Sequence, residues 1–361
     1  MTELYGERLG AGAFVDGYVV VAPAGEGTSS QVYRAEGPRG PVALKVLRRS
    51  LVADAVALRR FADEAHCLRT VSHPHLVRLE ASGDLSDGRP WLALEWLEGE
   101  TCARRLARLG AQSAERVADI VGAVAKALEA LHTAGFVHRD VAAHNVMLVE
   151  GRVVLLDFGV AKSEHRSMQL TSTGHLLGTP VALAPEVLRG EPASSASDWY
   201  ALGVLGWTLL HGSPPFRAPT VFELTQLHAR GELPAWKRGD AAWLEPAMRR
   251  CLAAAASARP SSAADLLGLL RRADARTVHV YVCPRGDSDD FDAWDATLRE
   301  GARGWGLQLE ADGAATLWAL RALDAADAEQ WREKLEAWVD SLGVPNGMTV
   351  ERKVTISVAE R

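Results

Sequence analysis

Cysteine is scarce in this sequence, and its few cysteines lie far apart. The 361-residue chain contains only Cys67, Cys102, Cys251 and Cys283. A structural zinc site needs closely spaced pairs of ligands, and a disulfide-stabilised scaffold needs a much higher density of cysteine. The spacing argues against both, and we expect buried or incidental thiols in a reducing compartment.

Long hydrophobic runs are also missing. The longest, ALGVLGWTLL at positions 201–210, has about half the length of a membrane span and favours a buried helix. The first residues, MTELYGERLGAG, carry charges and lack the apolar core of a signal peptide. We therefore expect a cytoplasmic protein without a membrane segment.

An excess of positive charge is absent as well. The net charge is -6, which gives no electrostatic reason to expect nucleic acid or an anionic membrane as a partner. The acidic excess lies in residues 277–361, where 16 Asp and Glu face 9 Lys and Arg. This tail therefore presents a different surface, and the chain length favours one large domain followed by a small one.

The hydrophobic pattern predicts a β-rich segment followed by a helical one. After an N-terminal extension at 1–17, residues 18–98 read as a three-strand meander, a helix over 54–71 and two further strands. Residues 99–275 are mostly helical, interrupted by a strand pair and by a long loop at 162–183 that we expect to be functional. The fold class is α+β, with a β-rich N-lobe and a helical C-lobe.

A glycine-rich stretch, GEGTSSQVY, runs from Gly25 to Tyr33 between two β-rich runs. Its glycines would allow backbone N–H groups to close over a polyphosphate. A glycine-rich hairpin is most often only a hairpin, so this motif alone decides little. A second glycine-rich run, GAGAF at 10–14, lies one strand too early relative to the next motif.

The next motif is VALK, which places Lys45 at the end of an apolar run. Such a lysine has a buried stem and an ammonium group that needs a counter-charge, although an edge-strand lysine that only aids solubility gives the same letters. Glu64, in the middle of the following helix, is the natural partner. A Lys45–Glu64 pair would fix the lysine on the phosphates of a nucleotide.

The strongest block combines Asp140 and Asn145 in HRDVAAHN with Asp157 in LLDFG. Asp140 could accept or orient the proton of an attacking hydroxyl, and the other two supply the hard oxygen ligands that Mg²⁺ prefers. Each residue by itself would be read as a turn residue. Together, in a strand–loop–strand context, they indicate phosphoryl-transfer chemistry.

These motifs together resemble the eukaryotic-like protein kinase family, in its bacterial serine/threonine (Hanks-type) branch. The resemblance covers residues 17–275 and rests on an ordered series: GEGTSSQV, VALK, RFADEA, HPHLV, HRD, DFG, GTPVALAPE, SDWYALGV and ARP. It implies a bilobal kinase domain at 18–275, with an N-lobe at 18–98 and a C-lobe at 99–275. It also implies transfer of the γ-phosphoryl group of Mg-ATP to Ser or Thr of protein substrates.

The resemblance also assigns roles to individual residues. The ATP-binding residues it implies are Gly25, Gly27, Val32, Ala43, Lys45, Leu94, Glu95 and Leu97, where Leu94 is the gatekeeper and residues 95–97 form the hinge. Asp140 would be the catalytic aspartate beside the Lys45–Glu64 pair, with Asn145 and Asp157 as Mg²⁺ ligands. Glu186 would pair with Arg259, and Asp198 would support the catalytic loop.

Arg139 places the chain among kinases whose activation loop is commonly organised by phosphorylation. Thr171, Ser172 and Thr173 are therefore candidate sites of autophosphorylation. Thr179 in GTP resembles the serine/threonine branch and favours hydroxyl acceptors of that type over tyrosine.

The sequence departs from the family pattern at the catalytic loop. The lysine usual two residues after the catalytic aspartate is Ala142 here, and the loss of that cation could lower the rate by orders of magnitude. The tyrosine-kinase branch also has alanine here, and it carries an arginine where this chain has His144. His144 is thus either a cationic substitute or a neutral loop residue. Ala182 replaces a usual aromatic on the floor of the substrate pocket, and Ser30 replaces the third loop glycine.

Two other functions compete with an active protein kinase. A pseudokinase, acting as an ATP-binding scaffold or allosteric partner, would fit Ala142 and Ala182, but Asp140 and the two metal ligands favour catalysis. A small-molecule phosphotransferase of similar bilobal fold would lack the GTP-to-APE segment that this chain keeps from Gly178 to Glu186.

Residues 277–361 read as strand, helix, two strands, helix and strand. Trp331, Leu335, Trp338 and Leu342 form one stripe of an amphipathic helix that stops at Gly343, so we expect these tryptophans in a core. The β-α-β-β-α-β order predicts a small ferredoxin-like α+β domain. Nothing in it looks catalytic, so we expect a regulatory or interaction domain that binds a partner or ligand.

Overall fold

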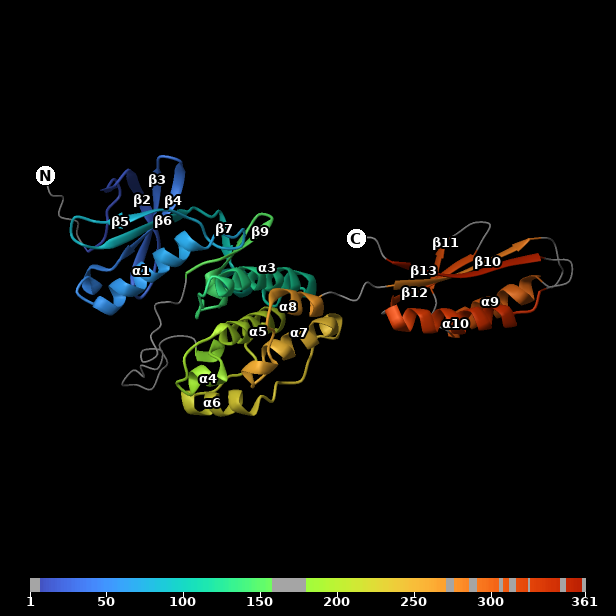
Figure 1. Cartoon of the computed structure of the whole chain (residues 1–361). Coiled ribbons are helices and arrows are strands. Elements are labelled where there is room, and N and C mark those ends of the chain that lie inside the picture. Colours follow the sequence, from blue (N-terminus) through green and yellow to red (C-terminus); the bar gives the residue numbers. More distant parts are fainter. Residues whose placement is uncertain are drawn as a thin grey trace. The chain divides into compact units, whose positions relative to one another are not determined.

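The structure is a computed structural model, and it describes part of the chain. The described residues are 7–157, 180–270, 276–285, 291–304, 308–311, 316–323, 325–344 and 349–358. The chain divides into two compact units, Met1–Leu270 and Arg271–Arg361 (Figure 1). No helix formed by the described residues is both long and apolar enough to cross a membrane.

A six-stranded antiparallel sheet forms the N-lobe of the first unit, in the order β1-β2-β3-β4-β6-β5. The strands are β1 (Phe14–Val15), β2 (Tyr18–Glu26), β3 (Ser30–Gly37), β4 (Gly40–Leu47), β5 (Leu79–Asp84) and β6 (Pro90–Glu95). Alternate residues of β3, including Tyr33 and Ala35, are buried, as expected for a strand with one covered face. The meander predicted from the sequence is therefore present as β2, β3 and β4.

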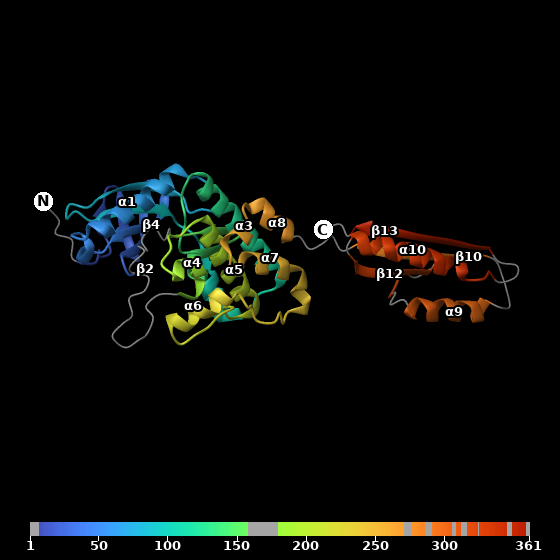
Figure 2. The ribbon, with the colours of Figure 1, turned by 60° about the horizontal axis from the view of Figure 1, so that its bottom comes forward.

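Helix α1 (Ala55–Thr70) packs beside strands β5 and β6 of this sheet (Figures 1 and 2). Its first turn is capped by Asp54, whose side chain accepts hydrogen bonds from the N–H groups of Val56 and Ala57. Phe61, Ala65 and Leu68 recur at helical spacing on its buried face, and Glu64 lies among them. The helix therefore brings one carboxylate into an apolar interface. A short 3₁₀ helix, η1 (Arg49–Leu51), precedes it.

Residues 7–17, predicted from the sequence as part of an N-terminal extension, pack on the N-lobe. β1 pairs with β2, and the N–H of Leu9 donates to the hydroxyl of Tyr33 at 3.1 Å. The fully buried Arg89 donates to the carbonyl of Glu7 at 3.1 Å. Leu9 and Val15 are buried in the apolar core of the N-lobe, so apolar packing and these hydrogen bonds together hold the segment in place.

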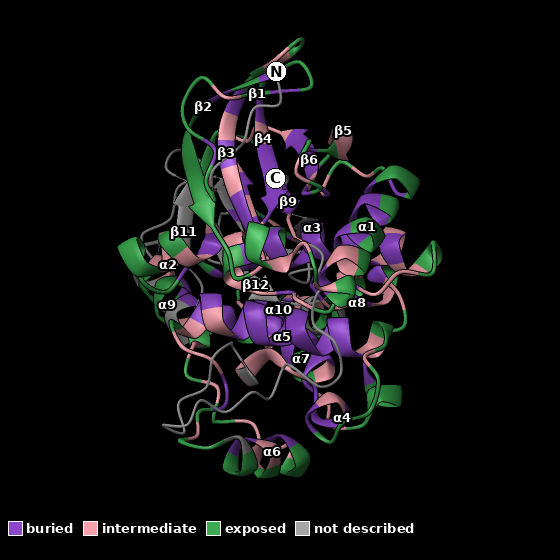
Figure 3. Ribbon diagram, turned by 90° about the vertical axis from the view of Figure 1, so that its left-hand side faces the viewer, coloured by how far each residue is buried: buried purple, intermediate pink, exposed green. Residues whose placement is uncertain are grey.

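The C-lobe is built around helix α5 (Ser195–His211). 13 of its 17 residues are buried, and the ribbon at its label is purple in Figure 3. It lies beside α3 (Ala114–Thr133) and α7 (Glu245–Cys251) (Figure 2). Two glycines allow the close approach of α7: a Cβ at Gly203 would lie 2.6 Å from that of Cys251, and one at Gly206 would lie 2.6 Å from Sδ of Met248. The run that was too short for a membrane span is therefore a buried helix, as predicted.

The described part of the C-lobe also contains further helices and a small sheet. The helices are α2 (Cys102–Leu109), α3 (Ala114–Thr133), α4 (Pro185–Leu188), α6 (Val221–Arg230), α7 (Glu245–Cys251) and α8 (Ala263–Leu269). The 3₁₀ helices are η2 (Ala143–Asn145), η4 (Pro180–Ala182), η5 (Gly239–Leu244) and η6 (Ala256–Ala258). A small antiparallel sheet contains β7 (Gly99–Thr101), β8 (Val146–Val149) and β9 (Arg152–Leu155). β8 and β9 are the strand pair predicted from the sequence, and they connect Asn145 to the segment that contains Asp157.

The second unit has its own sheet and core. Its elements are β10 (Arg276–Arg285), α9 (Phe291–Gly304), β11 (Gln308–Ala311), β12 (Thr316–Leu323), α10 (Ala325–Ser341) and β13 (Thr349–Val358). The sheet is antiparallel with the order β11-β12-β10-β13, and the element order matches the prediction. Its buried core includes Val280, Val282, Leu298, Leu335 and Val339. Trp331 and Trp338 pack against this core, as expected.

Candidate active site

The glycine-rich hairpin joins β2 and β3, where Gly25 lies opposite Val32. At its tip the N–H of Gly27 donates to the carbonyl of Ser30 at 2.9 Å. Arg48, just after β4, donates to the carbonyl of Gly27 from Nε (2.9 Å) and Nη2 (2.8 Å), and Nη2 also contacts Glu26 at 2.9 Å. The position of this hairpin tip is thus set by an arginine that the sequence analysis did not single out.

Several predicted ATP-binding residues lie opposite one another on neighbouring strands of the N-lobe sheet. Val32 on β3 is opposite Lys45 on β4, and Ala43 is opposite Leu94 on β6. Side chains two residues apart on a strand share a face, so Ala43 and Lys45 project to the same side. Glu95 ends β6, and Trp96 and Leu97 follow it.

Lys45 is a buried ion-pair centre. Its Nζ lies 2.7 Å from Oε1 of Glu64 on α1, and only 7% of Lys45 is exposed. Burial alone would lower the pKa of Lys45, but the carboxylates of Glu64 and Asp157 outweigh it and raise the pKa. Burial holds the pKa of Glu64 above its ordinary value, with Lys45 acting in the opposite direction. The structure thus forms the pair that VALK and the following helix predicted.

Asp157 follows β9 and contacts the same lysine, with 2.6 Å between Nζ of Lys45 and Oδ1 of Asp157. Its backbone has φ 36°, in the left-handed region that few residues other than glycine adopt. The positive charge of Lys45 lowers the pKa of Asp157 and keeps the carboxylate ionised. The sequence analysis assigned Asp157 to metal only and did not predict this contact.

Asp140 and Asn145 are joined directly. Nδ2 of Asn145 donates to the backbone carbonyl of Asp140 at 2.9 Å and to its Oδ2 at 3.0 Å. Asn145 is buried at the end of η2, so its amide is held with the nitrogen toward Asp140. This leaves the amide oxygen Oδ1 for a cation. Together with the Asp157 carboxylate, it forms a set of hard oxygen donors that fits Mg²⁺.

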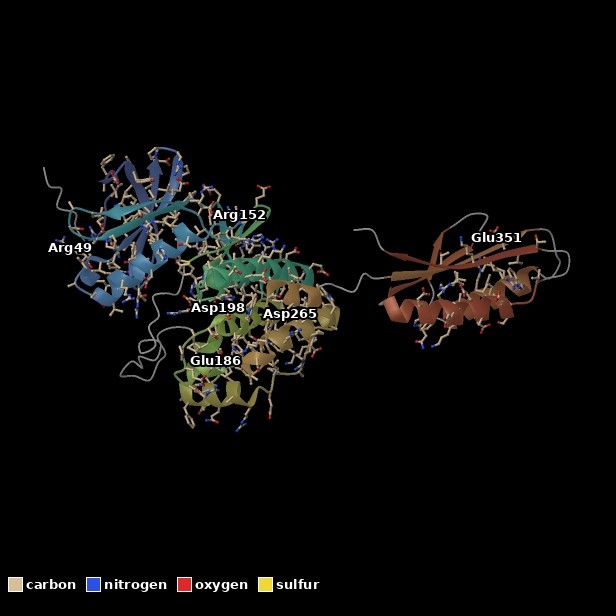
Figure 4. The ribbon with its side chains drawn as sticks, viewed as in Figure 1. Arg49, Arg152, Glu186, Asp198, Asp265 and Glu351 are labelled. Atoms are coloured by element: carbon tan, nitrogen blue, oxygen red, sulfur yellow. The ribbon has the colours of Figure 1, made fainter. Side chains whose placement is uncertain are left out.

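Asp198, near the start of α5, supports the loop formed by HRDVAAHN at 138–145 (Figure 4). Its carboxylate accepts hydrogen bonds from the N–H groups of His138 and Arg139, both at 2.8 Å, and from Nε2 of His132 at 2.9 Å. Asp198 is 1% exposed, and Arg139 adopts a left-handed φ of 67°. This buried carboxylate, with its three hydrogen-bond donors, therefore holds the backbone of Arg139 in a conformation that would be strained without support.

His138 connects this loop to the segment before Asp157. Its Nε2 donates to the carbonyl of Leu156 at 3.0 Å, and its Nδ1 accepts from the N–H of Asp140 at 3.3 Å. This pattern requires the neutral ring with its proton on Nε2. Burial lowers the pKa of His138, which agrees with the neutral form.

His144 lies beside Asp140, with 3.8 Å between its Nε2 and Oδ2 of Asp140, and 53% of its side chain is exposed. Ala142 has an extended backbone just before η2 and brings no cation to the loop. An imidazole is therefore within reach of the group that would receive the acceptor's proton.

Glu186, which is labelled in Figure 4, forms with Arg259 the pair that the resemblance implied. The contacts are parallel, Nη1–Oε1 at 2.6 Å and Nη2–Oε2 at 2.8 Å, and both residues are buried. Burial would raise the pKa of Glu186, but the hydrogen bonds and charge of Arg259 lower it overall. Thr171, Ser172, Thr173 and Thr179 lie outside the described residues.

A second cluster that sequence reasoning missed surrounds Glu95. Its carboxylate contacts the guanidinium of Arg152, with two N···O distances of 3.0 and 2.9 Å. The only signal for it in the sequence is a charged residue at the start of an otherwise apolar strand, GRVVLLD. Arg48 gives a similar signal, directly after the apolar end of β4.

Comparison with known proteins agrees with this geometry. Residues 18–268 match the family model described as "Protein kinase domain". The chain is 32% identical over 323 residues to the serine/threonine-protein kinase pkn3 of Myxococcus xanthus, covering 81% of this chain and 58% of that protein. It is 33% identical over 236 residues to PknF of Mycobacterium tuberculosis, covering 63% and 49%.

Solved structures give the same result. The kinase domain of Mycobacterium tuberculosis PknI superposes with a TM-score of 0.58 at 28% identity, covering 73% of this chain and 98% of that domain. The chain spans 58% or less of the length of the two curated relatives described above. The chain belongs to the protein kinase family, in its bacterial serine/threonine branch.

Proposed function

We propose that this chain binds Mg-ATP and transfers the γ-phosphoryl group to Ser or Thr hydroxyls of protein substrates. The observation that carries the proposal is the double contact of Lys45 with Glu64 and Asp157. These residues come from β4, α1 and the segment after β9. The two contacts of the Lys45 ammonium group can therefore form only when both lobes and α1 are correctly placed. A site preorganised in this way needs little rearrangement when phosphates bind.

The nucleotide would bind between the glycine-rich hairpin and the hinge. Gly25, Gly27 and Val32 would cover it, Ala43 and Leu94 would contact the base, and backbone groups of residues 95–97 would receive its polar edge. Lys45 would meet the phosphates. This assignment rests on the shared face of Val32, Ala43, Lys45 and Leu94 in the sheet.

Asn145 and Asp157 would hold Mg²⁺, which supplies neutralisation of phosphate charge when it is bound. The donor set supports this role, because both side chains present oxygen and Lys45 keeps Asp157 ionised. Waters and phosphate oxygens would complete the coordination, as is usual for this ion.

Asp140 would orient the acceptor hydroxyl and receive its proton. In the reaction the hydroxyl oxygen bonds to the γ-phosphorus, the bond from that phosphorus to the bridging oxygen of ADP breaks, and the proton passes to the Asp140 carboxylate. The hydrogen bonds from Asn145 support this role, because they hold that carboxylate in one orientation. His144 would supply, beside Asp140, the positive charge that Ala142 does not.

The proposal also covers the domain organisation. We assign residues 18–275 to the kinase domain, with lobes at 18–98 and 99–275, and residues 277–361 to a ferredoxin-like α+β domain that regulates it or binds a partner. The sheet order β11-β12-β10-β13, with helices α9 and α10 contributing to one core, supports the second assignment. Acidic residues outnumber basic ones in residues 277–361, 16 to 9, so a basic partner is favoured.

The test is phosphoryl transfer by the full chain. The protein is incubated with Mg²⁺ and γ-labelled ATP beside an Asp157→Ala control, and labelled residues are mapped by mass spectrometry. Label on Thr171, Ser172 or Thr173 that is absent from the control would establish catalysis and autophosphorylation. ATP binding without any labelling of the chain or of a generic acceptor protein would contradict the proposal.

A further inference from the structure

Arg152, at the start of β9, hydrogen bonds to three separate positions in the N-lobe (Figure 4). Its Nε donates to the carbonyl of Pro74 at 2.5 Å, and Nη2 donates to the carbonyl of Leu76 at 3.3 Å. Nη1 and Nη2 each donate to the carboxylate of Glu95, at 3.0 and 2.9 Å. One guanidinium of the C-lobe thus joins the segment after α1 to the end of β6.

Glu95 makes further hydrogen bonds in addition to those with Arg152. Oε1 also accepts from the N–H of Arg78 at 3.0 Å, while the N–H of Glu95 donates to the carbonyl of Arg78 at 2.9 Å. Only 11% of the Glu95 side chain is exposed. Burial would raise the pKa of Glu95, but the donors on Arg152 and Arg78 lower it overall, so the carboxylate is ionised at neutral pH.

The side chain of Glu95 lies on the opposite face of β6 from the predicted base-contacting residues. Glu95 is opposite Val42, whereas Leu94 is opposite Ala43, and successive side chains of a strand alternate between faces. The carboxylate therefore supports the hinge from the face opposite the predicted nucleotide site. Only the backbone of Glu95 is placed to contact a nucleotide.

Three parts of the candidate site meet at Arg152. Pro74 and Leu76 follow α1, which carries Glu64; Glu95 begins the hinge; and β9 leads to Asp157. We propose that Arg152 is a positioning residue, which fixes the hinge relative to α1 and to Asp157 through its bidentate contact with Glu95. This inference rests on the proposed function, because it assumes that the hinge receives adenine.

Loss of this contact is expected to weaken binding of the nucleotide base and to leave binding of the phosphates unchanged. Without Arg152, the Glu95 carboxylate would remain buried with one donor, and the hinge could leave its present position. A nucleotide would then have to order the hinge on binding, which weakens every ligand that carries the base. The contacts proposed for Lys45 with the phosphates and for Asp157 with Mg²⁺ do not involve Arg152.

The fold around Arg152 has further support, so its substitution can be tested in a folded protein. The N–H of Val77 donates to the carbonyl of Leu155 at 3.2 Å, and the N–H of Leu155 donates to that of His75 at 2.8 Å. These backbone contacts hold the segment after α1 on β9 without any side chain. Arg152→Met should therefore retain the fold.

Arg238 offers a matched control in the C-lobe. It makes a bidentate contact with Asp240, at 2.8 and 2.7 Å, and donates to the carbonyls of Leu210 at 2.8 Å and Gln112 at 3.3 Å. Its side chain is 26% exposed, against 32% for Arg152. The two arginines thus make the same kinds of contact, with a more exposed carboxylate in Asp240 (63%) than in Glu95 (11%), and of the two only Arg152 contacts the hinge.

The experiment is calorimetric titration of the full chain with adenosine and with Mg-ADP. We expect Arg152→Met and Glu95→Gln to weaken both ligands by the same factor, roughly fivefold. Lys45→Met should weaken Mg-ADP only, and Arg238→Met should change neither. The Glu95→Gln/Arg152→Met double variant should bind as weakly as the single variants, because the two residues act as one pair.

Each outcome decides the inference. Unchanged adenosine affinity in both Arg152→Met and Glu95→Gln, or an equal loss in Arg238→Met, would overturn it. If Arg152→Met does not fold, the nearly isosteric Glu95→Gln gives the answer alone. Failure of the wild-type chain to bind Mg-ADP would instead overturn the proposed function.

Discussion

Lys45 and Asp157 are 112 positions apart in sequence, yet Nζ of one lies 2.6 Å from Oδ1 of the other. β4 supplies the lysine from the N-lobe, and the segment after β9 supplies the aspartate. Because Glu64 on α1 contacts the same Nζ, the three groups report on the relative placement of both lobes and of α1. The first prediction follows from this relationship.

Replacement of Lys45 by Met should abolish phosphoryl transfer and also destabilise the chain. The change removes a cation and leaves the carboxylate of Glu64, which has 8% of its side chain exposed, in an apolar interface. We expect a loss of about 3 kcal/mol in the free energy of unfolding, measured with urea at pH 7. A Glu64→Gln/Lys45→Met double variant should recover part of that loss, because it leaves only Asp157 without its partner. No recovery would show that Glu64 does not carry the buried charge.

The Lys45–Glu64 pair could be predicted from the sequence because local patterns determine both positions. VALK places the lysine at a strand end, and the period of Phe61, Ala65 and Leu68 places Glu64 on the buried face of α1. The Arg152–Glu95 contact could not be predicted in the same way. It spans 57 positions and exists only because β9 packs against the segment after α1, and no local periodicity encodes that packing.

The N-terminal segment shows a similar limit. Leu9 is separated from Phe14 and Val15 by two glycines, and a period of hydrophobic residues therefore could not place the segment. Leu9 and Val15 are buried in the N-lobe core, and the buried side chains of Tyr33 and Arg89 form hydrogen bonds with the backbone of the segment. Contacts of this kind depend on the tertiary structure of the partner and leave no signal in the segment itself.

The second prediction concerns Arg48 and the glycine-rich hairpin. Arg48→Met should raise the KM for ATP roughly threefold with little change in kcat, since it releases the Gly27 carbonyl and lets the hairpin tip move. Arg8→Met is the matched control, because Arg8 contacts Glu26 at 3.0 Å without a bond to Gly27. Steady-state kinetics at two salt concentrations would check this. If both substitutions raise the KM equally, the change is due to the lost contact with Glu26, which both arginines share, and not to the Gly27 carbonyl.

The third prediction is a pH dependence centred on His228. Its ring is 1% exposed and its Nδ1 lies 2.9 Å from the hydroxyl of Tyr200, and burial lowers the pKa of His228 to about 4. The unfolded chain takes up a proton near pH 6.5 and the folded chain does not, so stability is complete above pH 6.5 and declines as pH falls toward 4. The full contribution is about 3 kcal/mol. Urea unfolding at pH 7 and pH 5 should show less dependence on pH in His228→Phe than in the wild type.

The fourth prediction tests the close approach of α5 and α7. Gly203→Ala would place a Cβ 2.6 Å from that of Cys251, a distance that real structures do not tolerate. We expect a loss of about 2 kcal/mol in the free energy of unfolding, from displacement of α7. Gly268→Ala is the control, since a Cβ there meets nothing within 4 Å. A stable Gly203→Ala variant would mean that α7 can shift without cost.

The last prediction concerns the position where the catalytic loop lacks its usual lysine. If His144 supplies the positive charge beside Asp140, then His144→Ala should lower the rate of phosphoryl transfer about tenfold, since a preorganised charge is lost from the site. Adding Ala142→Lys to that variant should restore the rate, because the new cation stands where the family usually has one. Initial rates with saturating ATP measure both effects. Unchanged activity in His144→Ala, together with a gain from Ala142→Lys in the wild-type background, would show that the loop works without a cation at position 142 or 144 and that His144 is a neutral loop residue.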